Sequence, residues 1–154
     1  MMDLVLWRHA DAEDAKPGAP DLERRLTARG EREATRIALW LHRQLPESTR
    51  IIASPAERAQ RTAMKLSRKF KTVDEIGPDA SPAQILAAAG WPDARRPVVV
   101  VGHQPSLGQA AALVLTGEVR DWSIRKGGVW WLRMREREGH DGALVLCVLT
   151  PEML

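Results

Sequence analysis

Short apolar runs alternate with longer segments in which apolar residues recur every three or four positions, and this pattern predicts strands separated by helices. The strands are expected at residues 3–7, 50–53, 72–76 and 97–101. The last of them contains four consecutive valines, Val98 to Val101. An uninterrupted β-branched run of this kind is typical of a strand buried on both faces at the centre of a parallel sheet.

Helices are expected over residues 27–45, 54 to about 70, 83–89 and 106–115. Thr27 can cap the first helix with its hydroxyl group. Ser54 followed by Pro55 is typical of an N-cap and a first helical position. Gly90 is expected to end the third helix, because glycine readily adopts the left-handed conformation found there.

The remaining segments complete the predicted topology. Residues 10–24 contain proline and glycine and predict a long polar loop, whereas 129–135 and 143–149 predict a hairpin around a turn at 139–142. The order β-α-β-α-β-α-β-α followed by β-β indicates a three-layer α/β/α sandwich. Its central sheet is expected to be mainly parallel, with a C-terminal antiparallel hairpin. Without a visible linker or repeat, residues 1–154 are expected to form a single domain.

Composition narrows the class of protein without identifying a function. The 154 residues carry a net charge of +3, with basic and acidic residues interleaved, which argues against a nucleic-acid binder. No apolar run approaches the roughly 20 residues that a membrane span requires, and the first residues become charged too early for a signal peptide. A single cysteine, Cys147, excludes an internal disulfide. We therefore expect a cytoplasmic protein, without membrane attachment and monomeric.

Residues whose side chains could take part in catalysis or binding follow three of the predicted strands. Arg8-His9 follows the first strand, Ser54-Pro55 with Arg58 follows the second, and Gly102-His103-Gln104-Pro105 follows the valine-rich strand. Each segment taken alone could be structural. A parallel sheet, however, carries all three to the same edge, where ligands bind in such folds.

Two histidines beside arginines favour phosphoryl chemistry. A neutral imidazole is a competent nucleophile toward phosphorus, and guanidinium groups match phosphoryl oxygens in charge and shape. A divalent metal is the rival interpretation for two histidines, but the neighbouring cations oppose it. We therefore expect a site that uses neither a metal nor a cofactor.

The same residues carry a family resemblance. The segment LWRHADAE resembles the Arg-His-Gly signature of the histidine phosphatase (phosphoglycerate mutase-like) superfamily, with Ala10 in place of the usual glycine. Further segments are similar, in the same order, to motifs of its small branch, the SixA-type phosphohistidine phosphatases: LTARGEREA, SPAERAQRTA, VVVVGHQPSLG and IRKGGVWWL. The resemblance implies that His9 is phosphorylated during catalysis. It also implies that Arg8, Arg58 and His103 complete the phosphate pocket.

Other polar residues have open roles. Gln104 can donate to phosphate or brace its own loop, and Arg61 can contact phosphate or pair with Glu57. A general acid would be needed for a phosphate ester, because its alkoxide leaving group must be protonated. The candidates for that acid are Asp74, Glu75 and Asp79, but no motif fixes any of them in the pocket.

Three functions remain open at this point. The first is a metal-independent phosphatase with a histidine nucleophile, acting on phosphohistidine in a protein, since imidazole leaves more easily than an alkoxide. The second is a broad phosphomonoesterase for small phosphorylated substrates. The third is a phosphate-recognition module that binds phosphorylated proteins without turning them over.

Overall fold

The computed structural model describes the backbone of residues 1–137 and 140–154 and the side chains outside residues 136–141. Its strands are β1 (Met2–Arg8), β2 (Arg50–Ala53), β3 (Lys71–Thr72), β4 (Val98–Gly102), β5 (Val129–Arg137) and β6 (His140–Leu149). Its α-helices are α1 (Ala28–Gln44), α2 (Glu57–Leu66), α3 (Pro82–Ala89) and α4 (Ser106–Thr116). Single 3₁₀ turns are η1 (Asp21–Glu23), η2 (Asp74–Ile76) and η3 (Pro151–Met153).

The strands of the described residues form one sheet in the order β3-β2-β4-β1-β5-β6. The four strands from β3 to β1 are parallel, whereas β5 runs antiparallel to both β1 and β6. Strand β4 lies between β2 and β1, and every residue in it is buried. The valine run therefore occupies the position that its sequence predicts, and the mainly parallel sheet with a C-terminal hairpin is confirmed.

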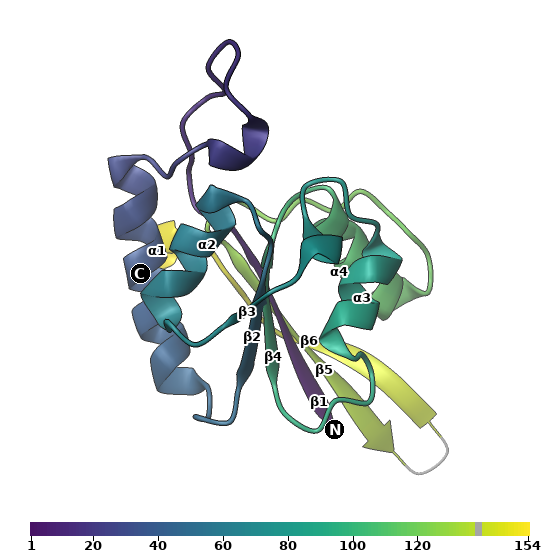
Figure 1. Ribbon diagram of the computed structural model, residues 1–154. Coiled ribbons are helices and arrows are strands. Elements are labelled where there is room, and N and C mark those ends of the chain that lie inside the picture. The colour runs from purple at the N-terminus through teal and green to yellow at the C-terminus, as the bar shows by residue number, and fades with distance from the viewer. Residues whose placement is uncertain (138–139) are drawn as a thin grey trace.

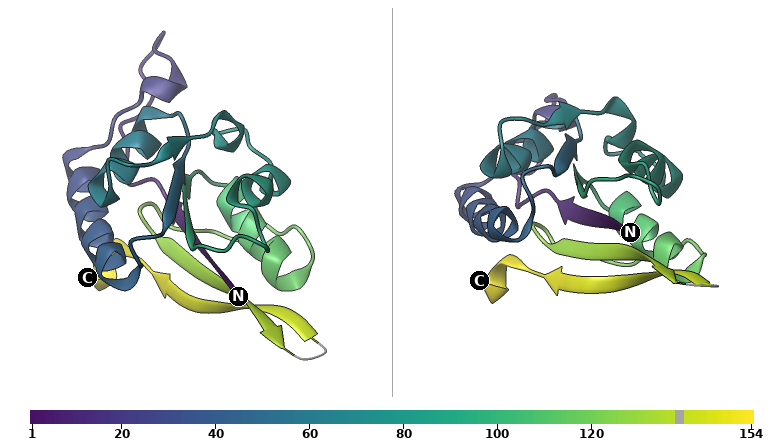
Figure 2. Two further views of the ribbon diagram at one scale, coloured as in Figure 1. Left: turned by 60° about the horizontal axis from the view of Figure 1, so that its bottom comes forward. Right: turned by 90° about the horizontal axis from the view of Figure 1, so that it is seen from below.

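Helices cover both faces of this sheet (Figure 1). Because side chains alternate along a strand, Val5 and Trp7 of β1 pack with α1 and α2, whereas Leu4 and Leu6 pack with α3 and α4. Figure 2 shows the two layers of helices on opposite sides, with β5 and β6 along one edge. The three-layer α/β/α architecture predicted from the sequence is confirmed.

Helix α2 is shorter than its sequence predicts. Ser54 is not its N-cap, because the helix begins at Glu57 after Ala56, and the Ser54 hydroxyl instead accepts from the Ala56 backbone N–H at 3.1 Å. At the other end the helix stops at Leu66, because the Ser67 hydroxyl accepts from the Lys69 backbone N–H and closes a local turn.

The predicted strand at 72–76 is wrong beyond its first residue. Strand β3 covers only Lys71 and Thr72, since its partner β2 ends at Ala53 and has no further backbone groups to pair. The chain then turns through η2, which buries Ile76 in the core between the sheet and α3. A single buried aliphatic side chain, rather than a strand, explains the apolar character of this segment.

The C-terminal hairpin is longer than expected. Strand β6 begins at His140, so the predicted turn at 139–142 is wrong for the part that the structure describes. Cys147 is half-buried against the α1 side of the core. No helix in the described part of the chain has the length and apolar character needed to span a bilayer.

Candidate active site

Three parallel strands end at the same level of the sheet. Trp7 of β1 and Ala53 of β2 both pair with Val101 of β4, so the residues that follow these strands emerge together. They are His9, Ser54 and His103. The backbone N–H groups of His9 and Ser54 bond to β4 at 3.0 Å each, to the carbonyls of Gly102 and Val101, which fixes the three chain ends as one edge.

His9 is buried at this edge, with 7% of its surface exposed. Its Nδ1 lies 2.8 Å from the carbonyl oxygen of Ala10, and only a protonated nitrogen can donate there. The lone pair of the neutral ring is therefore on Nε2. In this tautomer the Nε2 lone pair can accept a hydrogen bond or act as a nucleophile.

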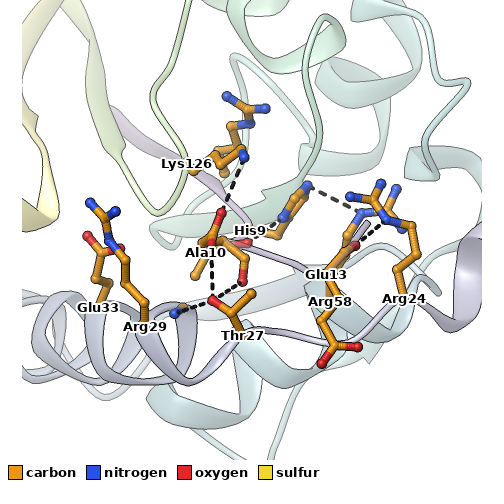
Figure 3. A network of polar contacts seen from close by, with 12 residues as sticks. His9, Ala10, Glu13, Arg24, Thr27, Arg29, Glu33, Arg58 and Lys126 are labelled. Atoms are coloured by element: carbon orange, nitrogen blue, oxygen red, sulfur yellow. Dashed lines mark hydrogen bonds and ion pairs between the residues drawn. The ribbon is translucent and has the colours of Figure 1, made fainter. Parts of the chain in front are cut away.

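Arg58 is brought to His9 by the first turn of α2. Its Nε donates to His9 Nε2 at 3.3 Å, and Figure 3 shows its guanidinium facing the imidazole ring. The other two nitrogens donate to Asp21, Nη1 to the backbone carbonyl at 2.9 Å and Nη2 to the carboxylate at 3.1 Å. Arg58 is buried, so these bonds hold a desolvated cation against the imidazole.

His103 packs beside His9, with a ring-centroid distance of 5.1 Å. Its Nε2 lies 2.7 Å from the Ser54 hydroxyl, which already accepts from Ala56. Because the Ser54 proton has His103 as its acceptor among the described contacts, we assign the lone pair of His103 to Nε2 and the proton to Nδ1. This Nδ1 is buried and has no partner in the described part of the chain.

Arg8 is directed to a neighbouring cavity. Its Nη1 donates to the carbonyl of Ile124 at 2.9 Å, while its Nε is buried without a partner among the described residues. It lines a cavity of about 410 Å³ together with Arg29, Glu33 and Lys126. The structure therefore brings His9, Arg58 and His103 into contact and places Arg8 beside them, with part of its guanidinium uncommitted.

Both the nitrogen and the oxygen of the Gln104 side-chain amide form hydrogen bonds to backbone groups around the loop after β4. Its Nε2 donates to the carbonyl of Trp122 at 2.8 Å, and its Oε1 accepts from the backbone N–H of Gly108 at 2.8 Å. A role in binding phosphate stays a prediction for this residue. Arg61 pairs with Glu57 at 2.8 Å on the exposed side of α2.

Both histidines are held neutral. Burial lowers the pKa of His9 to about 4; the bond to Ala10 acts against this shift, and the charges of Arg58, Arg8 and Arg24 add to it. Burial, followed by the charges of His9 and Arg58, lowers the pKa of His103 to about 3. At neutral pH this edge therefore presents an unprotonated imidazole, that of His9, close to the cations of Arg58, Arg8 and Arg24.

The sequence did not indicate the carboxylate that reaches this site. In the part of the chain that the structure describes, no hydrogen bond or ion pair joins His9 or His103 to Asp74, Glu75 or Asp79. Asp21 of η1 does contact Arg58, although it lies in a loop without periodicity or motif. The role of Ser54 as partner of His103 was also missed, because Ser-Pro before a helix has a simpler interpretation as a cap.

Comparisons with known proteins agree on one family. Residues 4–80 match the model of the histidine phosphatase superfamily (branch 1). The phosphohistidine phosphatase SixA of Escherichia coli K12 is 30% identical over 125 residues, which cover 76% of each chain. A candidate phosphohistidine phosphatase SixA from Agrobacterium tumefaciens has a TM-score of 0.79 at 25% identity, over 97% of each chain. A protein histidine phosphatase SixA solved with tungstate has a TM-score of 0.76 at 25% identity, over 98% of each chain.

Proposed function

The chain belongs to the histidine phosphatase superfamily and to its SixA-type branch, and is a phosphatase; from this premise we propose that it removes the phosphoryl group from phosphohistidine in proteins. His9 is the proposed nucleophile, and Arg8, Arg58 and His103 are the proposed phosphoryl-binding residues. The similarity to a SixA protein solved with tungstate supports this assignment, since tungstate is a tetrahedral oxyanion like phosphate.

In the first step, His9 Nε2 attacks phosphorus in line with the bond to the substrate imidazole. The new bond joins phosphorus to Nε2, and the bond between phosphorus and the substrate nitrogen breaks. Positive charge from Arg58 and Arg8, with the Nδ1–H of His103, stabilises the equatorial oxygens, which carry most of the charge in a loose transition state. The Ala10 carbonyl stabilises the charge that forms on the His9 ring.

Among the described residues, Asp21 is the carboxylate that pairs with Arg58, and its protonation state bears on the choice of substrate. Partial burial acts to raise the pKa of Asp21, but hydrogen bonds from Arg58 and Arg24 outweigh it and hold this pKa below its ordinary value. An ionised carboxylate cannot protonate an alkoxide leaving group. A substrate imidazole protonated on its other nitrogen leaves as a neutral ring and needs no such acid, which favours phosphohistidine over phosphate esters.

In the second step, water attacks the phosphorus of phospho-His9. The phosphorus–oxygen bond forms, the bond to Nε2 breaks, and the water protons pass to the phosphate product and to solvent. The electron pair returns to Nε2, so the neutral tautomer bonded to Ala10 is restored. The products are inorganic phosphate and the unmodified protein substrate.

The proposal is tested by comparing a phosphohistidine-containing protein with small phosphate esters as substrates of the purified protein. We expect a kcat/KM at least about 100-fold higher for phosphohistidine, in line with the contribution of a general acid that only the esters require. Rapid acid-free quenching should trap a phosphoryl group on His9. His9→Ala should abolish turnover, whereas His42→Ala, which changes an exposed histidine of α1, should not.

Each alternative gives a different result. Equal or faster turnover of small esters would assign the protein as a broad phosphomonoesterase instead. Binding of the phosphorylated protein without turnover would assign it as a recognition module. Near-normal activity of His9→Ala would refute the histidine mechanism itself.

A further inference from the structure

The loop between β1 and α1 places a third arginine, Arg24, near His9. The two ends of this loop are fastened together, since Ala12 bridges Leu26 and the Glu13 N–H donates to the Arg25 carbonyl at 2.8 Å. Between these ends, Arg24 donates from Nε to the carbonyl of Glu13 at 2.7 Å. This bond turns its guanidinium inward, and its charge is near enough to contribute to the lowered pKa of His9.

Asp21 lies between the guanidinium groups of Arg24 and Arg58. One carboxylate oxygen is 3.3 Å from Nη1 of Arg24, and the other is 3.1 Å from Nη2 of Arg58. Figure 3 shows Arg24 and Arg58 on the same side of His9. The Asp21 side chain is 51% exposed, whereas those of Arg24 and Arg58 are 26% and 5% exposed. A half-exposed anion thus occupies a position between two largely buried cations.

The Asp21 carboxylate and a phosphoryl group on His9 would use the same guanidinium, that of Arg58. Attack on phosphorus requires the Nε2 lone pair of His9, which accepts a hydrogen bond from Arg58 Nε. Arg58 donates to Asp21 through one N–H of each of its other two nitrogens. A phosphoryl group at His9 therefore competes with the Asp21 carboxylate for Arg58, and displacement of this carboxylate leaves the Nη1 of Arg24 without its anion.

We propose that Arg24 is a further phosphoryl-binding residue, and that the Asp21 carboxylate occupies the anion position between Arg24 and Arg58 until the phosphoryl group displaces it. The proposal rests on the proposed function only in that the site receives a phosphoryl group. It applies equally to a protein and to a small substrate. A charge-assisted bond from a partly buried guanidinium is the kind that contributes most to anion binding.

The effect of removing the Asp21 charge on anion binding distinguishes this proposal from a role of Asp21 in positioning Arg58 alone. If Asp21 served only to hold Arg58 over His9, then Asp21→Asn would loosen Arg58 and weaken anion binding. If Asp21 instead competes with the incoming anion, then Asp21→Asn removes both the competition and a like charge. Binding should then tighten.

The test is calorimetric titration of inorganic phosphate and of tungstate into the wild-type protein and four variants. Arg24→Ala should weaken binding of both anions about tenfold, as expected for the loss of one charged hydrogen bond at a partly exposed site. Arg24→Lys should recover part of this loss, because it keeps the charge without the planar fork. Asp21→Asn should tighten binding severalfold. Arg25→Ala is the matched control, since Arg25 is exposed on the same loop.

The double variant separates direct contact from an indirect effect. With Asp21→Asn present, Arg24→Ala should still weaken binding about tenfold. If Arg24→Ala does not weaken anion binding in the Asp21→Asn protein, Arg24 acts only through Asp21. This result would overturn the proposal. So would equal affinities of Arg24→Ala and Arg25→Ala, or weaker binding by Asp21→Asn. Anion binding is measured without turnover, so failure of the phosphohistidine assay leaves these results interpretable.

Discussion

Lowering the pH from 7.5 to 5 is expected to weaken the fold through its two buried histidines. Burial holds the pKa of His9 at about 4 and that of His103 at about 3, whereas both are near 6.5 in an unfolded chain. Below pH 6.5 the unfolded chain therefore binds protons that the folded protein does not. The free energy of unfolding must fall with pH across this window, down to the folded pKa values.

The size of the effect follows from these values. At pH 5 an unfolded-state pKa of 6.5 and a folded-state pKa of 3 to 4 correspond to about 2 kcal/mol for each histidine. The total for His9 and His103 is about 4 kcal/mol, a large share of the 5–15 kcal/mol typical of a domain. Carboxylates with lowered pKa, such as Asp11 and Asp21, act in the same direction but mainly below pH 4.

Urea denaturation at pH 7.5, 6 and 5 measures this loss. His9→Asn and His103→Asn should each lose about 2 kcal/mol less than the wild type over the same interval, whatever their stability at pH 7.5. His42→Asn removes an exposed histidine of α1 and should lose as much as the wild type. A His9 variant whose stability falls as steeply as that of the wild type would refute the argument that this ring is buried and neutral.

Three other predictions concern residues that pack around the site and the effect of bound phosphate on stability. Ser54→Ala should reduce the free energy of unfolding by about 1–3 kcal/mol and lower kcat, because it removes the partner of His103 and leaves a buried backbone N–H unpaired; urea denaturation and steady-state kinetics measure both. In Gly30→Ala the new Cβ would lie 2.1 Å from the Asp11 carbonyl oxygen, so we expect a loss of about 3 kcal/mol or no folding, whereas Gly142→Ala, with open space around it, should be neutral by the same assay. Inorganic phosphate at 100 times its Kd should add about 2.7 kcal/mol to the unfolding free energy, measurable as a rise in Tm; an unchanged Tm would contradict specific binding.

The parts of the fold that depend on local chemistry were predictable from the sequence. Thr27 accepts from the Gly30 N–H as an N-cap, and Gly90 ends α3 in the left-handed conformation, as expected. The central strand followed from the valine run alone. Strand β3 was not predictable, because its length is set by where β2 ends rather than by its own residues.

In the candidate site, too, some residues were predictable from the sequence and others were not. His9, Arg58 and His103 meet because parallel strands end at one edge of the sheet, which is a general property of this topology. Asp21 meets Arg58 through a loop whose path depends on bonds such as the one from Arg24 to Glu13. Such bonds form between neighbours in space, and no periodicity in the sequence records them.

The cations proposed to bind the phosphoryl group also lower the basicity of the nucleophile. Burial first, and then the charges of Arg58, Arg8 and Arg24, hold the pKa of His9 near 4, well below the value near 6.5 of an exposed imidazole. An imidazole of lower basicity is a better leaving group, so phospho-His9 should be cleaved by water more readily than the phosphohistidine of the substrate. An arriving phosphoryl group brings negative charge that offsets these cations, which raises the basicity of His9 while it attacks. Release of phosphate removes this negative charge, and the pKa of His9 returns to its resting value near 4 before the next substrate binds.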